Sequence, residues 1–145
     1  MYNLLQPRVF GLINRAVVDL PAAVQFLHGQ CASRDWNYAR ICFHADNEST
    51  LMSMLIVVVH KFSYPAHRHS WKDESYVIVN GSADYLELDD ADESVIFRQH
   101  MNEGSFFINN AKRFHCFKPH TDLFAFVEHT TGPFRGQPVE FMDQK

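Results

Sequence analysis

From Thr50 to His129, short stretches rich in β-branched and aromatic residues alternate with turn residues. This pattern constrains the fold more than any other feature of the sequence. Many short strands separated by turn residues are typical of a closed antiparallel barrel or jelly roll. Asn80 and Gly81 lie between two such stretches, and an Asn-Gly pair there predicts a tight hairpin. The sequence therefore predicts an all-β fold, a small antiparallel β-barrel. Its expected strands are 51–60, 74–80, 82–89, 94–100, 105–109, 113–117 and 122–129.

The first 45 residues have a different pattern. Asp19 before Leu20 and Pro21 predicts a helix start, because a carboxylate caps free N–H groups and proline is tolerated in the first turn. Gly29 is expected to end this short helix. No Gly/Ser-rich linker follows, so we expect one domain over residues 1–145. Its parts are an N-terminal helix and lead-in segment (1–45), a β-barrel core (46–131) and a C-terminal strap (132–145).

Composition argues against several classes of partner. The formal net charge is −4, whereas a nucleic-acid-binding domain needs a clustered basic face. The longest apolar run, 54–59, is far shorter than the roughly 20 residues that cross a bilayer. The three cysteines form no C-x-x-C pair, and charged residues interrupt the N-terminal segment, unlike a cleavable secretion signal. We therefore expect a cytoplasmic protein with no nucleic-acid or membrane partner.

Residues 65–81, PAHRHSWKDESYVIVNG, combine three groups that bind metals. His67 and His69 are two residues apart, so in a strand their side chains lie on the same face. Glu74 follows a short turn-like segment and can return as a third ligand. Imidazole and carboxylate groups bind divalent transition metals, and the pattern therefore predicts a metal site.

This stretch resembles the first motif of the cupin superfamily, G-x5-H-x-H-x(3,4)-E-x6-G. His67, His69, Glu74 and Gly81 stand at its defining positions, and Lys61 replaces the opening glycine. The resemblance implies a cupin fold, also called a double-stranded β-helix or jelly roll, with a metal held by the histidines and the glutamate.

The second cupin motif, G-x5-P-x-G-x2-H-x3-N, is similar to residues 104–119. Gly104 and His115 match, while Asn110, Lys112 and Pro119 replace the usual proline, glycine and asparagine. The resemblance therefore implies His115 as the fourth ligand, beside His67, His69 and Glu74, of one divalent ion of Fe, Mn, Ni, Cu or Zn.

A narrower resemblance is to the WbuC-type cupin metalloproteins. It rests on the helix before the cupin core and on four further matches: Arg40 with His44, Lys72 with Glu74, Glu128, and Gly132-Pro133-Phe134. Members of that group often occur with polysaccharide or O-antigen synthesis genes, so the resemblance implies a sugar-type ligand.

Further residues are expected around the metal. Arg113 lies two residues before His115, so it is expected on the same inward face, where it can bind a carboxylate or phosphate; the alternative is a rim position without a ligand. Arg40 either binds substrate or forms a surface salt bridge. Trp71 either stacks on a sugar or shields the metal, and Lys72 is a further candidate for substrate binding.

Three functions fit these features. The first is a metal-dependent isomerase, lyase or oxygenase that acts on a small polar or sugar-like molecule, with Glu128 or His44 as the titratable catalytic group. The second is a non-catalytic sugar- or metabolite-binding protein that uses the metal as an anchor. The third is a metal-free, epimerase-like protein with a histidine base. We also expect a homodimer, because open barrels have strand edges to protect.

Overall fold

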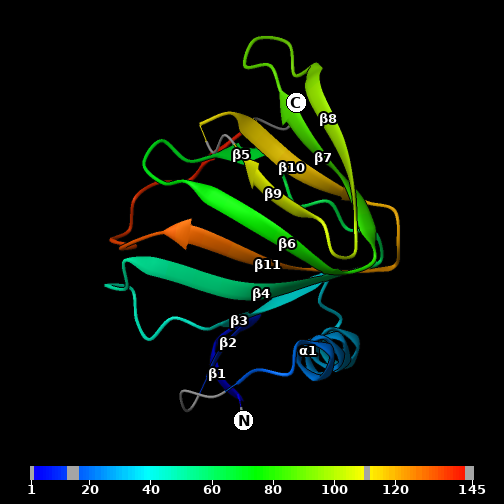
Figure 1. The fold of residues 1–145 in the computed structure, drawn as a ribbon, viewed down its shortest axis with the longest axis vertical. Helices are drawn as coiled ribbons and strands as arrows, with labels where there is room; N and C mark the ends of the chain where they lie inside the picture. Colours follow the sequence, from blue (N-terminus) through cyan, green and yellow to red (C-terminus); the bar gives the residue numbers. More distant parts are fainter. Residues whose placement is uncertain (1, 13–16, 110–111, 143–145) are drawn as a thin grey trace.

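The computed structural model describes residues 2–12, 17–109 and 112–142. Most of the described structure consists of β-strands, and one helix lies between the second and third strands of the chain (Figure 1). The predicted all-β class with a short N-terminal helix is confirmed. The elements are β1 (Tyr2–Gln6), β2 (Val9–Leu12), α1 (Leu20–Arg34), β3 (Tyr38–Cys42), β4 (Leu51–Val59), β5 (His67–Arg68), β6 (Glu74–Asn80), β7 (Ser82–Leu88), β8 (Val95–Asn102), β9 (Phe106–Asn109), β10 (Phe114–Pro119), β11 (Leu123–Thr131) and β12 (Glu140–Phe141).

The described strands form two sheets. One has the order β1-β2-β3-β4-β11-β6-β9, and the other has the order β12-β5-β10-β7-β8. Neighbouring strands are antiparallel with one exception among the described pairs, since β2 and β3 run parallel. The N-terminal segment therefore contributes three strands to the first sheet. The sequence analysis expected only a helix there.

The Asn80-Gly81 pair does not form the predicted hairpin. Gly81 does turn the chain, with a φ of 76°, but β6 pairs with β11 and β9 while β7 pairs with β10 and β8. The chain thus crosses from one sheet to the other at this turn. A turn residue fixes the local backbone, whereas the choice of strand partner depends on distant segments.

Helix α1 begins where the sequence predicts and ends later. Asp19 caps it, since its carboxylate accepts a hydrogen bond from the backbone N–H of Ala22 at 3.1 Å. The predicted end at Gly29 is wrong: the helix continues to Arg34, and Asp35 follows in a left-handed conformation. A mid-helix glycine costs about 1 kcal/mol, and burial of Leu27 and Cys31 on either side of Gly29 offsets this cost.

The first sheet separates two apolar clusters. Alternate residues of β3 and β4, including Ile41 and Leu55, pack against α1 on the outer face. Their neighbours face the second sheet, where Tyr76, Tyr85 and Phe126 form the inner cluster. Side chains in a strand alternate between faces, so this division follows from the strand pattern.

The C-terminal segment contributes a strand to the second sheet. Its strand β12 pairs with β5, with Phe141 opposite His67. No helix in the described part of the chain has the length and apolarity needed to cross a membrane.

Candidate metal centre

A cavity of about 880 Å³ lies between the inner faces of the two sheets. Both sheets, the N-terminal strands and the C-terminal segment supply side chains to its wall. Polar and ionisable groups among them include Arg8, Tyr38, Arg40, His44, Asp46, Tyr64, His67, His69, Trp71, Lys72, Glu74, Tyr76, His115, Glu128 and Thr130.

The four residues expected as ligands lie together in this cavity. His67 on β5 is directly opposite His115 on β10, with ring centroids 4.8 Å apart. The ring of His69 is 5.1 Å from that of His67. Glu74, on β6 of the other sheet, has its carboxylate oxygens 3.4 Å from Nε2 of His69 and 3.1 Å from Nε2 of His115. The cluster therefore bridges the two sheets.

Hydrogen bonds fix the tautomers of two of these histidines. Nδ1 of His67 lies 3.0 Å from the carbonyl oxygen of Pro65, and Nδ1 of His115 lies 2.8 Å from that of Arg113. A carbonyl oxygen only accepts, so both Nδ1 atoms carry the proton, and in the neutral rings both Nε2 atoms keep a free lone pair. This is the arrangement that orients a histidine for a metal ion.

Two buried imidazole nitrogens of this cluster have no hydrogen-bond partner among the described residues. They are Nε2 of His115 and Nδ1 of His69. His115 Nε2 is close to the carboxylate of Glu74 but lacks the geometry of a hydrogen bond to it. Buried polar atoms are normally satisfied, so an unpaired lone pair beside a carboxylate fits a divalent cation.

Burial also keeps two of these imidazoles neutral. It lowers the pKa of His67 to about 4 and that of His69 to about 3, and neighbouring cationic groups contribute to both shifts. Only a neutral imidazole has the lone pair that binds a metal. Both rings are therefore in the ligating state at neutral pH.

The carboxylate of Glu74 is held by two residues that the sequence analysis did not single out. The hydroxyl of Tyr76 and the amide Nδ2 of Asn109 each donate to its Oε2 at 3.0 Å. Tyr76 is two residues from Glu74 on one strand, and this spacing was a usable signal. Asn109 comes from β9, and only the sheet pairing brings it there.

Lys72 places a cation beside the same carboxylate. Its Nζ is 2.6 Å from Oε1 of Glu74 and 3.7 Å from Oε1 of Glu128. Burial raises the pKa of Glu74, but His115 and Lys72 lower it by more, so the net pKa is well below its usual range. Burial and the nearby Glu74 raise the pKa of Glu128. The Lys72 ammonium lowers this pKa and so offsets part of the rise.

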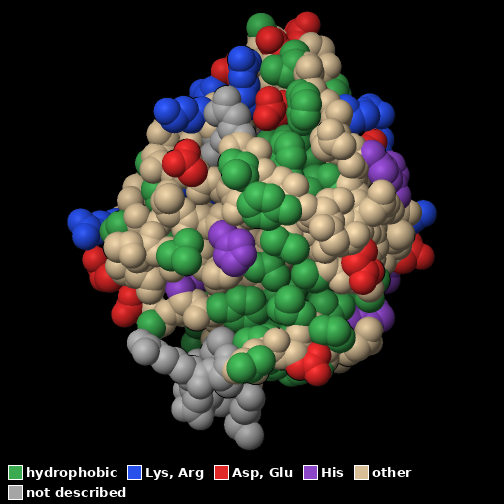
Figure 2. Space-filling view, viewed as in Figure 1, with side chains coloured by type: hydrophobic (Ala, Val, Ile, Leu, Met, Phe, Trp, Pro, Cys, Tyr) green, Lys and Arg blue, Asp and Glu red, His purple; other side chains and the backbone are tan. Residues whose placement is uncertain are grey.

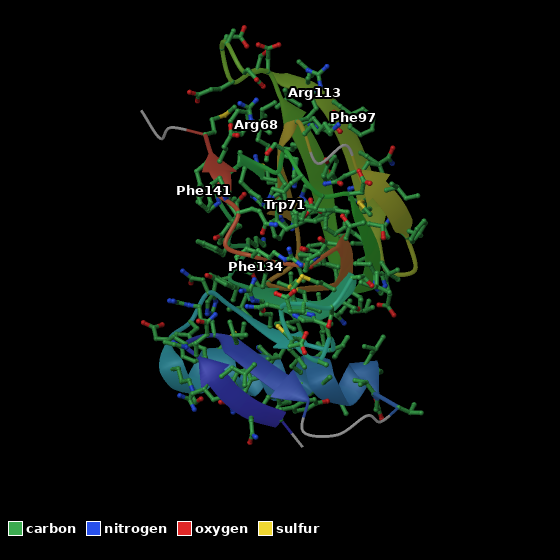
Figure 3. All side chains as sticks on the ribbon, turned by 90° about the vertical axis from the view of Figure 1, so that its left-hand side faces the viewer. Arg68, Trp71, Phe97, Arg113, Phe134 and Phe141 are labelled. Carbon is green, nitrogen blue, oxygen red and sulfur yellow. The ribbon has the colours of Figure 1, made fainter. Side chains whose placement is uncertain are left out.

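The remaining predicted residues divide into two groups. Arg40, His44 and Trp71 line the cavity, and the ring of Trp71 lies 6.2 Å from that of His69. Arg113 does not line it: the side chain is exposed and lies at the end of the molecule remote from the helix (Figure 3). Strand β10 begins only at Phe114, so the alternation used to place Arg113 does not extend to it.

A second cluster with metal-binding groups lies outside the cavity lining. Asp84 Oδ1 is 2.9 Å from Nδ1 of His100 and 2.9 Å from Nε2 of His120, close enough for the three to share one ion. The two histidines are exposed, and Arg98 approaches the other carboxylate oxygen to 3.6 Å. The sequence analysis did not single out any of these three residues.

No protein-family model and no curated protein sequence matches this chain. Similar solved structures include the cupin domain of Cnp3 from Schizosaccharomyces pombe (TM-score 0.56, 9% identity, 66% of this chain and 65% of that one). DMSP lyase DddQ from Ruegeria pomeroyi is another (TM-score 0.59, 15% identity, 79% of this chain and 57% of that one). A mutant oxalate decarboxylase from Bacillus subtilis is a third (TM-score 0.54, 17% identity, 64% of this chain and 24% of that one). The chain spans less than two thirds of each, and at these identities the likeness is one of fold.

Proposed function

We propose that this chain, which has the cupin fold, is a metal-dependent enzyme acting on a small polar molecule in the cavity. One divalent ion of Fe, Mn, Ni, Cu or Zn binds to His67, His69, Glu74 and His115. The observation that carries the proposal is the buried Nε2 of His115, which has no hydrogen-bond partner among the described residues and lies 3.1 Å from Glu74.

The bound ion would polarise a carbonyl or acidify a bound hydroxyl group. Glu128 has the position and the raised pKa of a group that takes a proton from the substrate and returns it at a neighbouring atom. Lys72 stabilises the ionised form of Glu128, and Trp71 lines the cavity beside His69. Proton transfer of this kind favours isomerase or lyase chemistry among the reactions open to such a site.

The substrate is proposed to be sugar-derived, from polysaccharide synthesis. The support is the WbuC-type resemblance at Arg40, His44 and Glu128, all of which line the cavity. The fold neighbours include a lyase and a decarboxylase by name, so the same fold carries metabolic enzymes.

A metal-free protein is the second candidate, because Lys72 already gives Glu74 a cationic partner at 2.6 Å. In that case the histidines would serve as base and hydrogen-bond donors. A binding protein without catalysis would keep the metal but need no proton acceptor at Glu128.

Metal content decides between the first two candidates. We expect about one equivalent of a transition metal per chain, by elemental mass spectrometry, in protein purified without chelator or nickel affinity resin. His69→Ala should lose the metal and keep the fold, while His28→Ala, a control on the exposed face of α1, should keep both. Absence of metal that added ions cannot restore would refute the proposal.

Catalysis is tested by hydrogen exchange. Incubation with aldoses, ketoses and uronic acids in D₂O should place deuterium next to the carbonyl of the true substrate, detected by proton NMR. Glu128→Gln should abolish this exchange and leave metal content unchanged. Metal-loaded protein that binds a sugar of this panel but exchanges no hydrogen would indicate the non-catalytic alternative.

A homodimer and a cytoplasmic location belong to the same proposal. Unpaired Cys31, Cys42 and Cys116 suit a reducing compartment. Phe106 and Ile108 on the edge strand β9 are 62% and 66% exposed, and Figure 2 shows hydrophobic side chains over the region of β9 and β6. An uncharged apolar patch at a free edge suits a second copy.

Light scattering after size exclusion tests the dimer. The double variant Phe106→Ser/Ile108→Ser should be monomeric, whereas Leu51→Ser, at an equally exposed site on β4, should remain dimeric. A wild-type monomer would refute this part of the proposal without affecting the metal site.

A further inference from the structure

Two arginines face the cavity from neighbouring N-terminal strands. Arg8 directly precedes β2, Arg40 lies in β3, and both line the cavity. The backbone N–H of Arg40 donates to the carbonyl oxygen of Arg8 at 2.8 Å, and β2 runs parallel to β3 with Val9 opposite Arg40. The parallel pairing of the N-terminal strands thus fixes both arginines on one wall of the cavity.

Both arginine side chains are half-buried, and each has an unused N–H donor. Their Nε atoms are buried and have no hydrogen-bond partner within the described part of the chain. Arg40 reaches only the sulfur of Met54, at 4.0 Å, which is a weak acceptor. By contrast, the exposed Arg135 pairs with Glu48 at 3.2 Å.

No carboxylate of the described residues lies within 4.0 Å of a nitrogen of the Arg8 or Arg40 guanidinium group. Arg68, Arg98 and Arg135, by contrast, each form an ion pair with a carboxylate. Buried donors are normally satisfied, and Glu128, whose charge acts on Arg40, is farther from it than an ion pair would be. The two unused Nε–H donors suit an acceptor that the described residues do not supply, and the two guanidinium charges favour an anion in that role.

A row of aromatic rings connects this wall to the histidine cluster. The guanidinium carbon of Arg8 lies 5.3 Å from the ring centroid of Tyr38 and 5.7 Å from that of Trp36. Tyr38 is 5.5 Å from Tyr64, and Tyr64 is 5.5 Å from His67. A carbon skeleton that packs on Tyr38 and Tyr64 can therefore extend from the arginines to the cluster.

We infer that Arg8 and Arg40 form a subsite for the oxyanion of the ligand, a carboxylate or a phosphate, whose other end reaches the histidine cluster. The inference rests on the proposed function, since it takes the cavity as the substrate site. Arginine suits this role because its planar donors match the oxygens of carboxylate and phosphate groups. The substrate class becomes a sugar acid or a sugar phosphate, and a neutral sugar is disfavoured.

Calorimetric titration of metal-loaded protein with D-galacturonate, D-galactose 6-phosphate and D-galactose tests the subsite. We expect one of the anionic sugars to bind at least tenfold more tightly than galactose. Arg8→Gln and Arg40→Gln should each weaken that binding about tenfold to a hundredfold, as expected for a lost charged hydrogen bond. Arg98→Gln, an exposed arginine on β8, is the matched control and should change nothing.

A second measurement uses the wild-type protein and does not depend on the variants folding. Titration with inorganic phosphate and with acetate should shift the ¹⁵N-¹H signals of the Nε–H groups of Arg8 and Arg40, but not that of Arg98. The preferred sugar identifies the anion as carboxylate or phosphate. Equal binding of galactose, unchanged binding in both variants, or unshifted Nε signals would each overturn the inference.

Metal content measured on every sample distinguishes a failure of the proposed metal centre from a failure of the anion subsite. Anion binding without a metal would refute the proposed metal centre and leave the subsite standing. A full metal complement without selective anion binding would refute the subsite alone.

Discussion

Nε2 of His115 lies 3.1 Å from Oε2 of Glu74, although the two residues belong to different sheets. An ion bound by both would join β10 to β6 across the inner face of the molecule. A ligand that binds only the folded state adds its binding free energy to the stability of that state. A metal bound at this site would therefore stabilise the two-sheet fold.

Removal of the metal is expected to lower the melting temperature. A free-ion concentration of about 100 times Kd adds about 2.7 kcal/mol to the folded state, so scanning calorimetry with and without EDTA should give separated transitions. His69→Ala should melt at the same temperature in both conditions. Coincident transitions for the wild type would argue against an ion that bridges the sheets.

The hydroxyl of Tyr76 is expected to tune metal affinity through Glu74. Tyr76→Phe removes the 3.0 Å hydrogen bond to Oε2 and leaves the ring in place. Loss of such an orienting contact typically weakens metal binding 10- to 100-fold, measurable by competition with a fluorescent chelator. Tyr2→Phe is the matched control, since Tyr2 packs on Phe26 and lies outside the cavity lining. Equal affinities in the two variants would remove the orienting role of Tyr76.

The sequence predicted what depends on neighbouring residues. His67 and His69 share a face because they are two apart in an extended segment, and Asp19 caps α1 because its carboxylate reaches a free N–H. The strand limits also agree to within one or two residues, for example Leu51–Val59 against the expected 51–60.

Features that depend on distant pairing were not predictable in this way. The Asn80-Gly81 turn separates two sheets because β6 and β7 each prefer other partners. Asn109 reaches Glu74 only through the pairing of β9 with β6, and Arg8 reaches the cavity only through the pairing of β2 with β3. No periodicity in a single stretch encodes such contacts.

Gly81→Ala is expected to destabilise the fold strongly. A methyl group there would collide with Thr121 Oγ1 and the carbonyl oxygen of Leu123, at a φ of 76° that L-residues avoid. Gly104→Ala has a similar φ of 84° but meets no atom within 4 Å, so it isolates the conformational cost, about 1–2 kcal/mol. Urea denaturation should give Gly81→Ala a loss of about 3 kcal/mol or more. Equal losses would show that the turn accommodates a side chain.

Cys31 is expected to make the fold sensitive to alkaline pH. Burial raises the pKa of its thiol from 9.0 to about 11. Above pH 9 the unfolded chain loses this proton first, so stability falls between pH 9 and 11, by about 2 kcal/mol in all. The difference in unfolding free energy between the wild type and Cys31→Ala, measured across this range, should change accordingly. A constant difference would contradict the raised pKa.

Lys72→Met distinguishes a metal centre from a metal-free site. Without the ammonium, Glu74 is a buried carboxylate with no cationic partner in EDTA, and such a loss costs about 3–5 kcal/mol. If a metal binds at Glu74, added ions should restore the stability and bind more tightly than in the wild type, because a competing cation is gone. Lys118→Met, an exposed site on β10, should show neither effect. Urea denaturation with EDTA measures the loss of stability, and the same measurement with saturating Zn²⁺ or Mn²⁺ measures its recovery. A Lys72→Met protein that no ion rescues would mean that Lys72 itself is the permanent partner of Glu74, and the metal-free candidate would then stand.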